Sequence, residues 1–157
     1  MFHFSDKTLE MLHRAGWSEE YEYDIHDYRN FLSSQGYHVH DAALSFMRRF
    51  GGLVIAYPLL RRPTATETLT LAVTGSPDSL FKDKARHLSE EIGIDVIEIG
   101  TSETGDLDLY MDATGCVYAE GAILNRVAKS GEEAIENICS GNHGEALLAN
   151  GPAQILL

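Results

Sequence analysis

Cysteine, long apolar runs and basic residues are all scarce in this sequence, and each scarcity excludes a class of protein. The two cysteines, Cys116 and Cys139, are too few for a disulfide scaffold and do not form a CxxC pair. No apolar run approaches the roughly 18 residues of a transmembrane helix. The first residues, MFHFSDKTLEMLHRAGW, are charged throughout and lack the apolar segment of a signal peptide. We therefore expect a protein with reduced thiols that stays in the cytoplasm and binds no membrane.

Basic residues are outnumbered two to one, with 12 lysines and arginines against 24 aspartates and glutamates and a net charge of −12. Proteins that bind nucleic acid present a basic face, so this composition argues against a nucleic-acid partner. Two explanations of the acidity stay open. It keeps the protein in solution, or it attracts a basic protein partner through the electrostatic field of the molecule.

Two adjacent glycines in the segment RRFGGLVIAYP (48–58) raise the question of a phosphate-binding loop. Such a loop follows a strand and opens a helix, so that backbone amides at the helix N-terminus face the anion. Here the order is reversed, because a helical pattern precedes Gly51 and an apolar run follows Gly52. We interpret Gly51 as a left-handed residue that ends the helix and Gly52 as the turn into a strand. The absence of a GxSxG motif likewise argues against a serine hydrolase.

The remaining elements follow from hydrophobic spacing and from residues that cap helices. Apolar residues at helical spacing, preceded by capping residues such as Ser5, Asp24 and Ser130, predict helices, and alternating segments predict strands. The predicted helices cover about 5–16, 24–36, 41–50, 76–93 and 130–141, and the predicted strands cover 53–57, 67–75, 94–100 and a hairpin over 105–121, with 122–130 as a strand or loop. We therefore predict one α+β domain over residues 1–157, with an antiparallel or mixed sheet and helices packed on one side.

Five segments occur in an order that resembles the SUKH superfamily, and most closely its third branch of bacterial immunity proteins. They span roughly residues 10–141 and read AGW at 15–17, FGGL at 50–53, IG at 99–100, YMDATGCVYA from Tyr110 and SGEEAIENICSG from Ser130. The resemblance implies an α+β, non-enzymatic protein encoded beside a polymorphic toxin. It also implies a partner, because members bind and neutralise a cognate toxin domain, often a nuclease or a deaminase. The last residues, 142–157, match no part of the family, and their role is unassigned.

One group of these motif residues is expected to shape the fold without touching the partner. Trp17 and Phe50 are large aromatic residues next to predicted helix ends, where they join the helices to the sheet. The group consists of Gly16, Trp17, Phe50, Gly51, Gly52 and Leu53. The acidic segment that follows Trp17 departs from the family, in which a basic residue is expected at this place.

The acidic segment SEEYEYDIHDY (18–28) interleaves carboxylates with tyrosines. Tyrosine is enriched in the cores of protein interfaces, and carboxylates attract a basic partner, such as a nuclease that must itself hold phosphates. The residues expected to bind the partner are therefore Glu19, Glu20, Tyr21, Glu22, Tyr23, Asp24 and Asp27. A purely structural interpretation is also open, in which Asp24 caps a helix, the glutamates favour its N-terminus and the tyrosines lie in the core.

Three functions are compatible with these observations. The first is an immunity protein that blocks the active site of its toxin without catalysis, and the second is a cytosolic adaptor of the same fold with several weak partners. The third is a small metal-dependent hydrolase, because His38 and His40 form an HxH pair whose side chains would share one face of a strand. No third ligand stands at a diagnostic spacing, and both cysteines fall in apolar stretches, so we expect no metal, no cofactor and no catalytic residue. The oligomeric state stays open.

Overall fold

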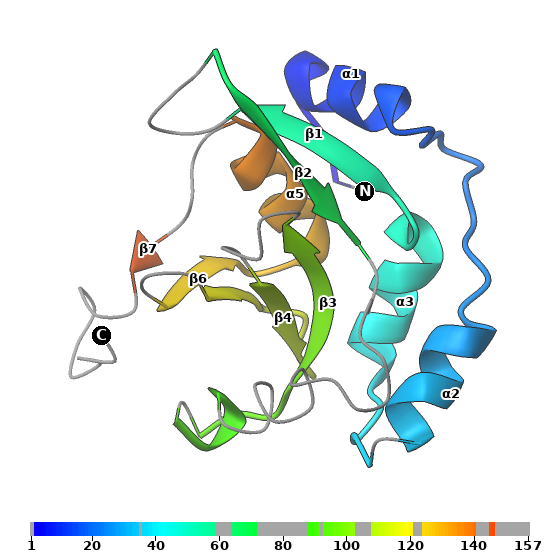
Figure 1. The fold of residues 1–157 in the computed structure, drawn as a ribbon, viewed down its shortest axis with the longest axis vertical. Coiled ribbons are helices and arrows are strands. Elements are labelled where there is room, and N and C mark those ends of the chain that lie inside the picture. Colours follow the sequence, from blue (N-terminus) through cyan, green and yellow to red (C-terminus); the bar gives the residue numbers. More distant parts are fainter. Residues whose placement is uncertain are drawn as a thin grey trace.

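The fold is built on one antiparallel sheet whose strands pair in the order in which they occur along the chain. A computed structural model describes residues 2–34, 36–58, 64–71, 88–91, 93–102, 108–120, 124–140 and 145–146. The strands are β1 Val54–Pro58, β2 Thr66–Thr70, β3 Val96–Ser102, β4 Asp108–Asp112, β5 Val117–Glu120, β6 Leu124–Ala128 and β7 Glu145–Ala146. Figure 1 shows that the sheet curls along this order. The neighbouring strands are antiparallel throughout the described residues, which confirms an α+β fold with an antiparallel sheet.

The helices begin near the residues predicted to cap them. They are α1 Asp6–Arg14, α2 His26–Ser34, α3 Asp41–Phe50 and α5 Gly131–Ser140, and residues 88–91 are helical as well. The Ser5 hydroxyl accepts the N–H of Thr8 at the start of α1, and the Ser130 hydroxyl accepts the N–H of Glu133 in α5. Most of the helix predicted over 76–93 lies outside the described residues, as does the tail over 142–157 except for β7. No helix in the described part has the length and apolarity needed to cross a membrane.

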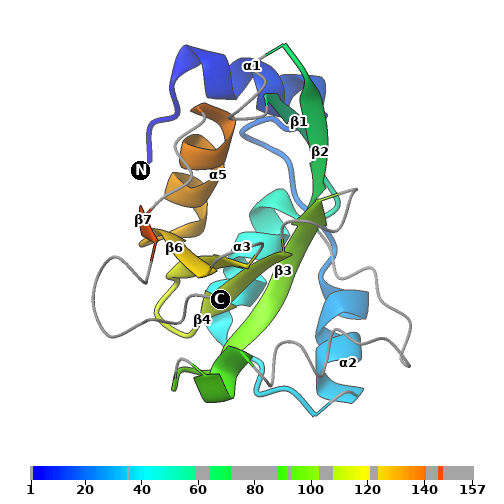
Figure 2. The ribbon, with the colours of Figure 1, turned by 60° about the vertical axis from the view of Figure 1, so that its left-hand side comes forward.

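The core lies between the sheet and the helices α1, α3 and α5. Helix α1 lies beside α5 and β1, α5 also contacts β6, and α3 contacts β3 and β4 (Figures 1 and 2). The inward side chains form one apolar cluster, whose large buried members include Leu12, Met47, Phe50, Ile55 and Ile99. Helices α1, α3 and α5 therefore pack on one side of the sheet, in agreement with the predicted α+β arrangement.

A smaller cluster lies on the other face of the sheet. Successive side chains of a strand point to opposite faces, and Tyr110 follows Leu109, which belongs to the main core. Tyr110 pairs with Tyr118 of the next strand, and both belong to one buried cluster with Leu88 and Val96. The short helical segment that contains Leu88 therefore lies on the face opposite to α1, α3 and α5.

One carboxylate ties the start of the chain to α5. Glu136 accepts hydrogen bonds from the Ser5 N–H at 2.6 Å, from the Ser5 hydroxyl at 3.0 Å and from the Thr8 hydroxyl at 2.7 Å. Burial alone would raise the pKa of Glu136, but these bonds favour the charged form and hold the pKa below its ordinary value. The contact fixes α1 against α5 although the two residues Ser5 and Glu136 are 131 positions apart.

At the end of α3, the glycine with a left-handed backbone is not the predicted one. Gly51 has a φ of −59°, whereas Gly52 has a φ of 78°. The expectation that Gly51 takes the left-handed conformation was therefore wrong by one residue. A side chain at Gly51 is disfavoured for another reason, because a Cβ atom there would overlap the ring of Tyr23 and crowd the carbonyl group of Met47. The glycine pair thus lets a tyrosine from another segment lie directly on the backbone.

Candidate partner-binding surface

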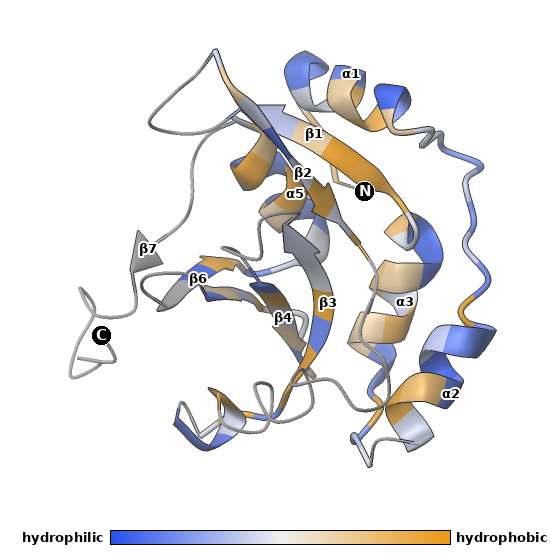
Figure 3. Cartoon of the chain, viewed as in Figure 1, coloured by the Kyte–Doolittle hydropathy of each residue, from blue (hydrophilic) through white to orange (hydrophobic). Residues whose placement is uncertain are grey.

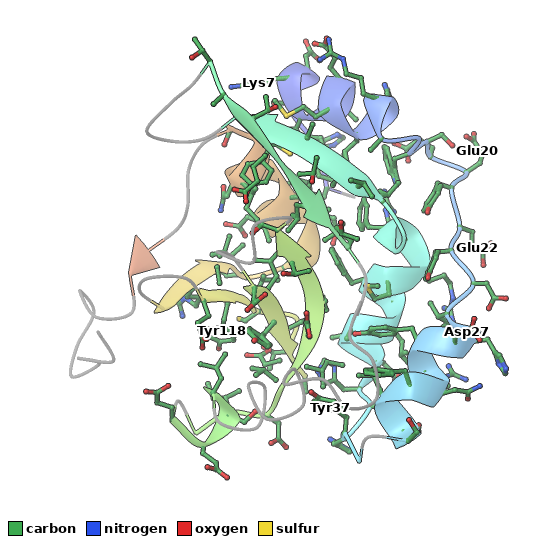
Figure 4. All side chains as sticks on the ribbon, in the orientation of Figure 1. Lys7, Glu20, Glu22, Asp27, Tyr37 and Tyr118 are labelled. Carbon is green, nitrogen blue, oxygen red and sulfur yellow. The ribbon has the colours of Figure 1, made fainter. Side chains whose placement is uncertain are left out.

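The acidic segment forms an extended strap between α1 and α2. Residues 18–25, which we call the acidic strap, are neither helix nor strand. Exposed carboxylates alternate along the strap with buried or half-buried residues. The outward residues are Glu20, Glu22 and Asp24, and the inward residues are Tyr21, Tyr23 and Ile25. In Figure 4 Glu20 and Glu22 point away from the body of the protein, as does Asp27 in the first turn of α2. The structure therefore divides the predicted set into inward tyrosines and outward carboxylates.

Tyr21 and Tyr23 hold the acidic strap against the end of α3. The Tyr21 hydroxyl donates to the carbonyl oxygen of Gly51 at 2.5 Å, and burial, with a contribution from Tyr23, raises the pKa of Tyr21. The backbone N–H of Tyr23 donates to the carbonyl oxygen of Arg48 at 2.7 Å. The Tyr23 ring lies so close to Gly52 that a Cβ atom there would be 2.7 Å from its Cε1 atom. These contacts fix the backbone of the strap, and hence the positions of the carboxylates between them.

The outward carboxylates have few partners of their own. Glu19 pairs with Arg49 at 3.8 Å, and one oxygen of Asp24 accepts the N–H of His26 at 2.9 Å. Glu20 and Glu22 form no ion pair with any described residue. Figure 3 shows the strap as mostly hydrophilic. The strap is therefore a row of negative charge held in a fixed position on the surface.

The motif residues next to the strap lie in the core. The Trp17 and Phe50 rings stack at a centroid distance of 5.7 Å, and the Trp17 indole N–H donates to the carbonyl oxygen of Arg49 at 3.2 Å. The Arg49 guanidinium lies over both rings, 5.6 Å from Trp17 and 5.4 Å from Phe50. Leu53 is buried, and Gly16, with a φ of 100°, turns the chain after α1. Arg49 therefore joins this aromatic stack to the acidic strap, a role that sequence reasoning did not predict.

The sequence profile of the SUKH-3 immunity proteins matches residues 4–141. The chain belongs to the SUKH-3 family. No curated protein and no solved structure matches it. The family match confirms the resemblance carried by the segments from Ala15 onward, and it extends that resemblance to the residues that lead into α1. Residues 142–157 lie outside the match.

One histidine of the HxH pair in this SUKH-3 protein is part of a helix cap. The Nδ1 atom of His40 accepts the N–H of Ala43 at 3.3 Å, at the start of α3. Its Nε2 atom lies 3.2 Å from the carbonyl oxygen of Met111, so the proton is placed on Nε2. His38 is exposed, and the described part of the chain holds no group of three His, Cys, Asp or Glu residues placed to bind a metal ion. Both ring nitrogens of His40 are therefore used by the backbone.

The two cysteines of the SUKH-3 protein are free thiols. Cys139 is buried in α5, where burial, with a smaller effect of Glu136, raises the pKa of the thiol to about 12. A thiol that stays protonated is a poor nucleophile. Cys116 is half-buried, and its backbone N–H donates to Asp112.

We expect His40 to make the protein less stable as the pH falls below about 6.5, which is the ordinary pKa of a histidine side chain. Burial lowers the pKa of His40 and outweighs the opposing effects of the Met111 carbonyl and Asp112. The unfolded chain therefore binds a proton that the folded chain does not, and the free energy of unfolding falls between about pH 7 and pH 5. His40→Asn keeps a capping side chain that does not titrate, so it should remove most of this slope. Urea unfolding across this range measures the effect, and equal slopes in both proteins would contradict it.

Proposed function

We propose that this SUKH-3 protein neutralises a basic toxin domain by binding it through the acidic strap and covering its active site, without catalysis. The family supports an immunity role, and the strap supports the choice of surface. The observation that carries this choice is the alternation along the strap, where inward tyrosines fix the backbone and outward carboxylates face the solvent. The free thiols fit a protein that acts in the cytoplasm.

Carboxylates in fixed positions suit this task for two reasons. A toxin that acts on nucleic acid holds phosphates with basic side chains, so its active site attracts negative charge. A strap that is already held in place loses little conformational freedom on binding, which lowers the cost of association. The proposed contact residues are Glu19, Glu20, Glu22, Asp24 and Asp27, and Tyr21 and Tyr23 support them from below.

Reversing two charges of the strap should slow association with the toxin about tenfold at low salt, because these charges steer the encounter. The variant is Glu20→Lys with Glu22→Lys, since both residues are exposed and form no ion pair within the described residues. The matched control is Asp6→Lys with Asp41→Lys, which changes the net charge equally at exposed positions outside the strap that form no ion pair within the described residues. Stopped-flow rates at several salt concentrations measure the effect, and the strap variant should also show the flatter salt dependence. Equal slowing in both variants would mean that only the net charge matters.

The partner for this measurement is obtained by affinity capture from a lysate of the source organism at low salt, followed by mass spectrometry. One dominant basic protein with a variable C-terminal domain, released at high salt, is the result expected for an immunity protein. Many weakly held partners would instead favour an adaptor of the same fold. Unchanged association of the toxin with the strap variant would move the contact to another surface.

A further inference from the structure

A hollow of about 630 Å³ opens beside the first residues of β3. Val96 and Ile97, the buried first residues of β3, are among the residues that line it. One wall is the loop after α2 that carries Tyr37, which is labelled in Figure 4. The opposite wall carries Glu90 and Asp95, whose side chains are exposed. This volume falls within the range of protein sites that hold a small ligand or a partner's side chain.

Both walls of the hollow are held by hydrogen bonds. The N–H groups of Gly93 and Val96 donate to the carbonyl and hydroxyl oxygens of Ser89, at 2.8 and 3.1 Å. In the facing wall the N–H of Tyr37 donates to the carbonyl oxygen of Leu32 at 3.0 Å. The hollow is therefore formed without a partner, and binding requires little rearrangement of the backbone.

The lining combines apolar and aromatic residues with two exposed carboxylates. Glu90 and Asp95 supply two carboxylates, and no lysine or arginine is among the described residues that line the hollow. Tyr37 supplies an aromatic wall, and Ile94 stands at the rim with 41% of its surface exposed. A cation carried on an apolar stem matches this pattern, because its charge meets the carboxylates while its stem covers the apolar surface.

We propose that this hollow is a docking site for an arginine side chain of a basic protein partner. Arginine fits better than lysine, because its planar guanidinium stacks on an aromatic ring and bonds a carboxylate through two N–H groups. Helix α2 joins the acidic strap to the loop that forms one wall of the hollow (Figure 1). Its nine residues span roughly 13 Å, so one partner lying along α2 reaches both surfaces. The inference rests on the proposed function for the nature of the partner, although its test needs no toxin.

The test is an NMR titration of the full chain, labelled with nitrogen-15, with N-acetyl-arginine amide as the probe. The amide signals of residues that line the hollow, such as His38, Gly93 and Asp95, should shift and saturate with a dissociation constant on the order of millimolar. N-acetyl-citrulline amide has nearly the same shape without the charge, and it should bind about tenfold more weakly. Equal binding of both probes, or saturable shifts only outside the hollow, would overturn the inference.

Two variants separate the hollow from the strap. Glu90→Gln with Asp95→Asn removes both rim charges at exposed positions, and it should weaken binding of the arginine probe about tenfold. Glu20→Gln with Glu22→Gln changes the strap by the same charge and should leave this binding unchanged. Loss of binding in the strap variant instead would place the arginine on the strap and overturn the inference. The arginine titration thus tests the hollow, whereas the toxin association rates test the proposed function.

Discussion

Replacing Gly51 with alanine is expected to lower the free energy of unfolding by about 2–4 kcal/mol. The φ of −59° at Gly51 suits any residue, so the cost comes from space and not from backbone conformation. A Cβ atom would overlap the ring of Tyr23 and lie 2.5 Å from the carbonyl oxygen of Met47. That carbonyl belongs to the last turn of α3 and accepts the N–H of Gly51, so it cannot move away without opening the helix end. The Tyr23 ring must therefore leave its place.

Displacement of the Tyr23 ring should also loosen the acidic strap, because the strap is held at this end of α3. Urea unfolding measures the loss of stability, and hydrogen exchange at the Tyr23 amide measures the loosening. Gly16→Ala is the matched control, since Gly16 has a φ of 100° but open space around it. The control should cost about 1 kcal/mol and leave exchange at Tyr23 unchanged. Combining Gly51→Ala with Tyr23→Ala should cost less than the sum of the two, and strict additivity would contradict the proposed clash.

Much of the fold could be predicted because its signals act over one helical turn or one hairpin. Ser5 and Ser130 bond the third residue after them, and Gly16 is left-handed directly after α1, so each marks its helix end from short range. The hairpin over 105–121 likewise follows from alternating residues around a short turn, and the structure places β4 and β5 there. These features are determined by interactions between residues close in sequence, so they can be predicted from a single sequence.

Features that depend on distant segments could not be predicted in the same way. The alternation in the strap exists because Tyr21 bonds Gly51, 30 positions further on, and no spacing within the strap reveals this contact. The same acidic residues are compatible with a helix cap and with an interface, and their spacing does not distinguish the two roles. Strand β3 begins two residues later than predicted, which leaves Ile94 exposed at the rim of the hollow. The hollow itself joins the loop after α2 to the start of β3, and only the fold brings these two segments together.

The turn between β4 and β5 contains the segment YMDATGCVYA, which contributed to the family resemblance. The carboxylate of Asp112 is buried there and accepts the N–H of Thr114 at 2.8 Å and its hydroxyl at 2.6 Å. It also accepts the N–H of Cys116 at 3.1 Å and the hydroxyl of Tyr118 at 2.9 Å. Burial alone would raise the pKa of Asp112, but the bonds from Thr114, Tyr118 and Cys116 hold it below its ordinary value. The motif therefore builds a turn around one buried charge.

Asp112→Ala is expected to lower the free energy of unfolding by about 2–3 kcal/mol, because the buried Tyr118 hydroxyl and the partly exposed donors of Thr114 and Cys116 lose their charged acceptor. Asp112→Asn keeps one acceptor oxygen and should cost about 1–2 kcal/mol. Asp27→Asn, at an exposed position in α2, is the control and should change stability by less than about 0.5 kcal/mol. Urea unfolding at neutral pH compares the three proteins. A loss in Asp112→Ala no larger than that of the control would contradict the role of the carboxylate.

The pH dependence separates the charge of Asp112 from its shape. Because the pKa of Asp112 is lowered in the folded chain, its stabilising effect is complete above the ordinary value of about 4 and is lost as the pH falls through the folded pKa. Glu136 acts with the same sign, since its pKa is also lowered, so the wild-type slope at acidic pH contains both contributions. Asp112→Asn should remove one contribution and leave that of Glu136. If Asp112→Asn did not change the slope, the geometry of the acceptor and not its charge would be the reason for an aspartate in this turn.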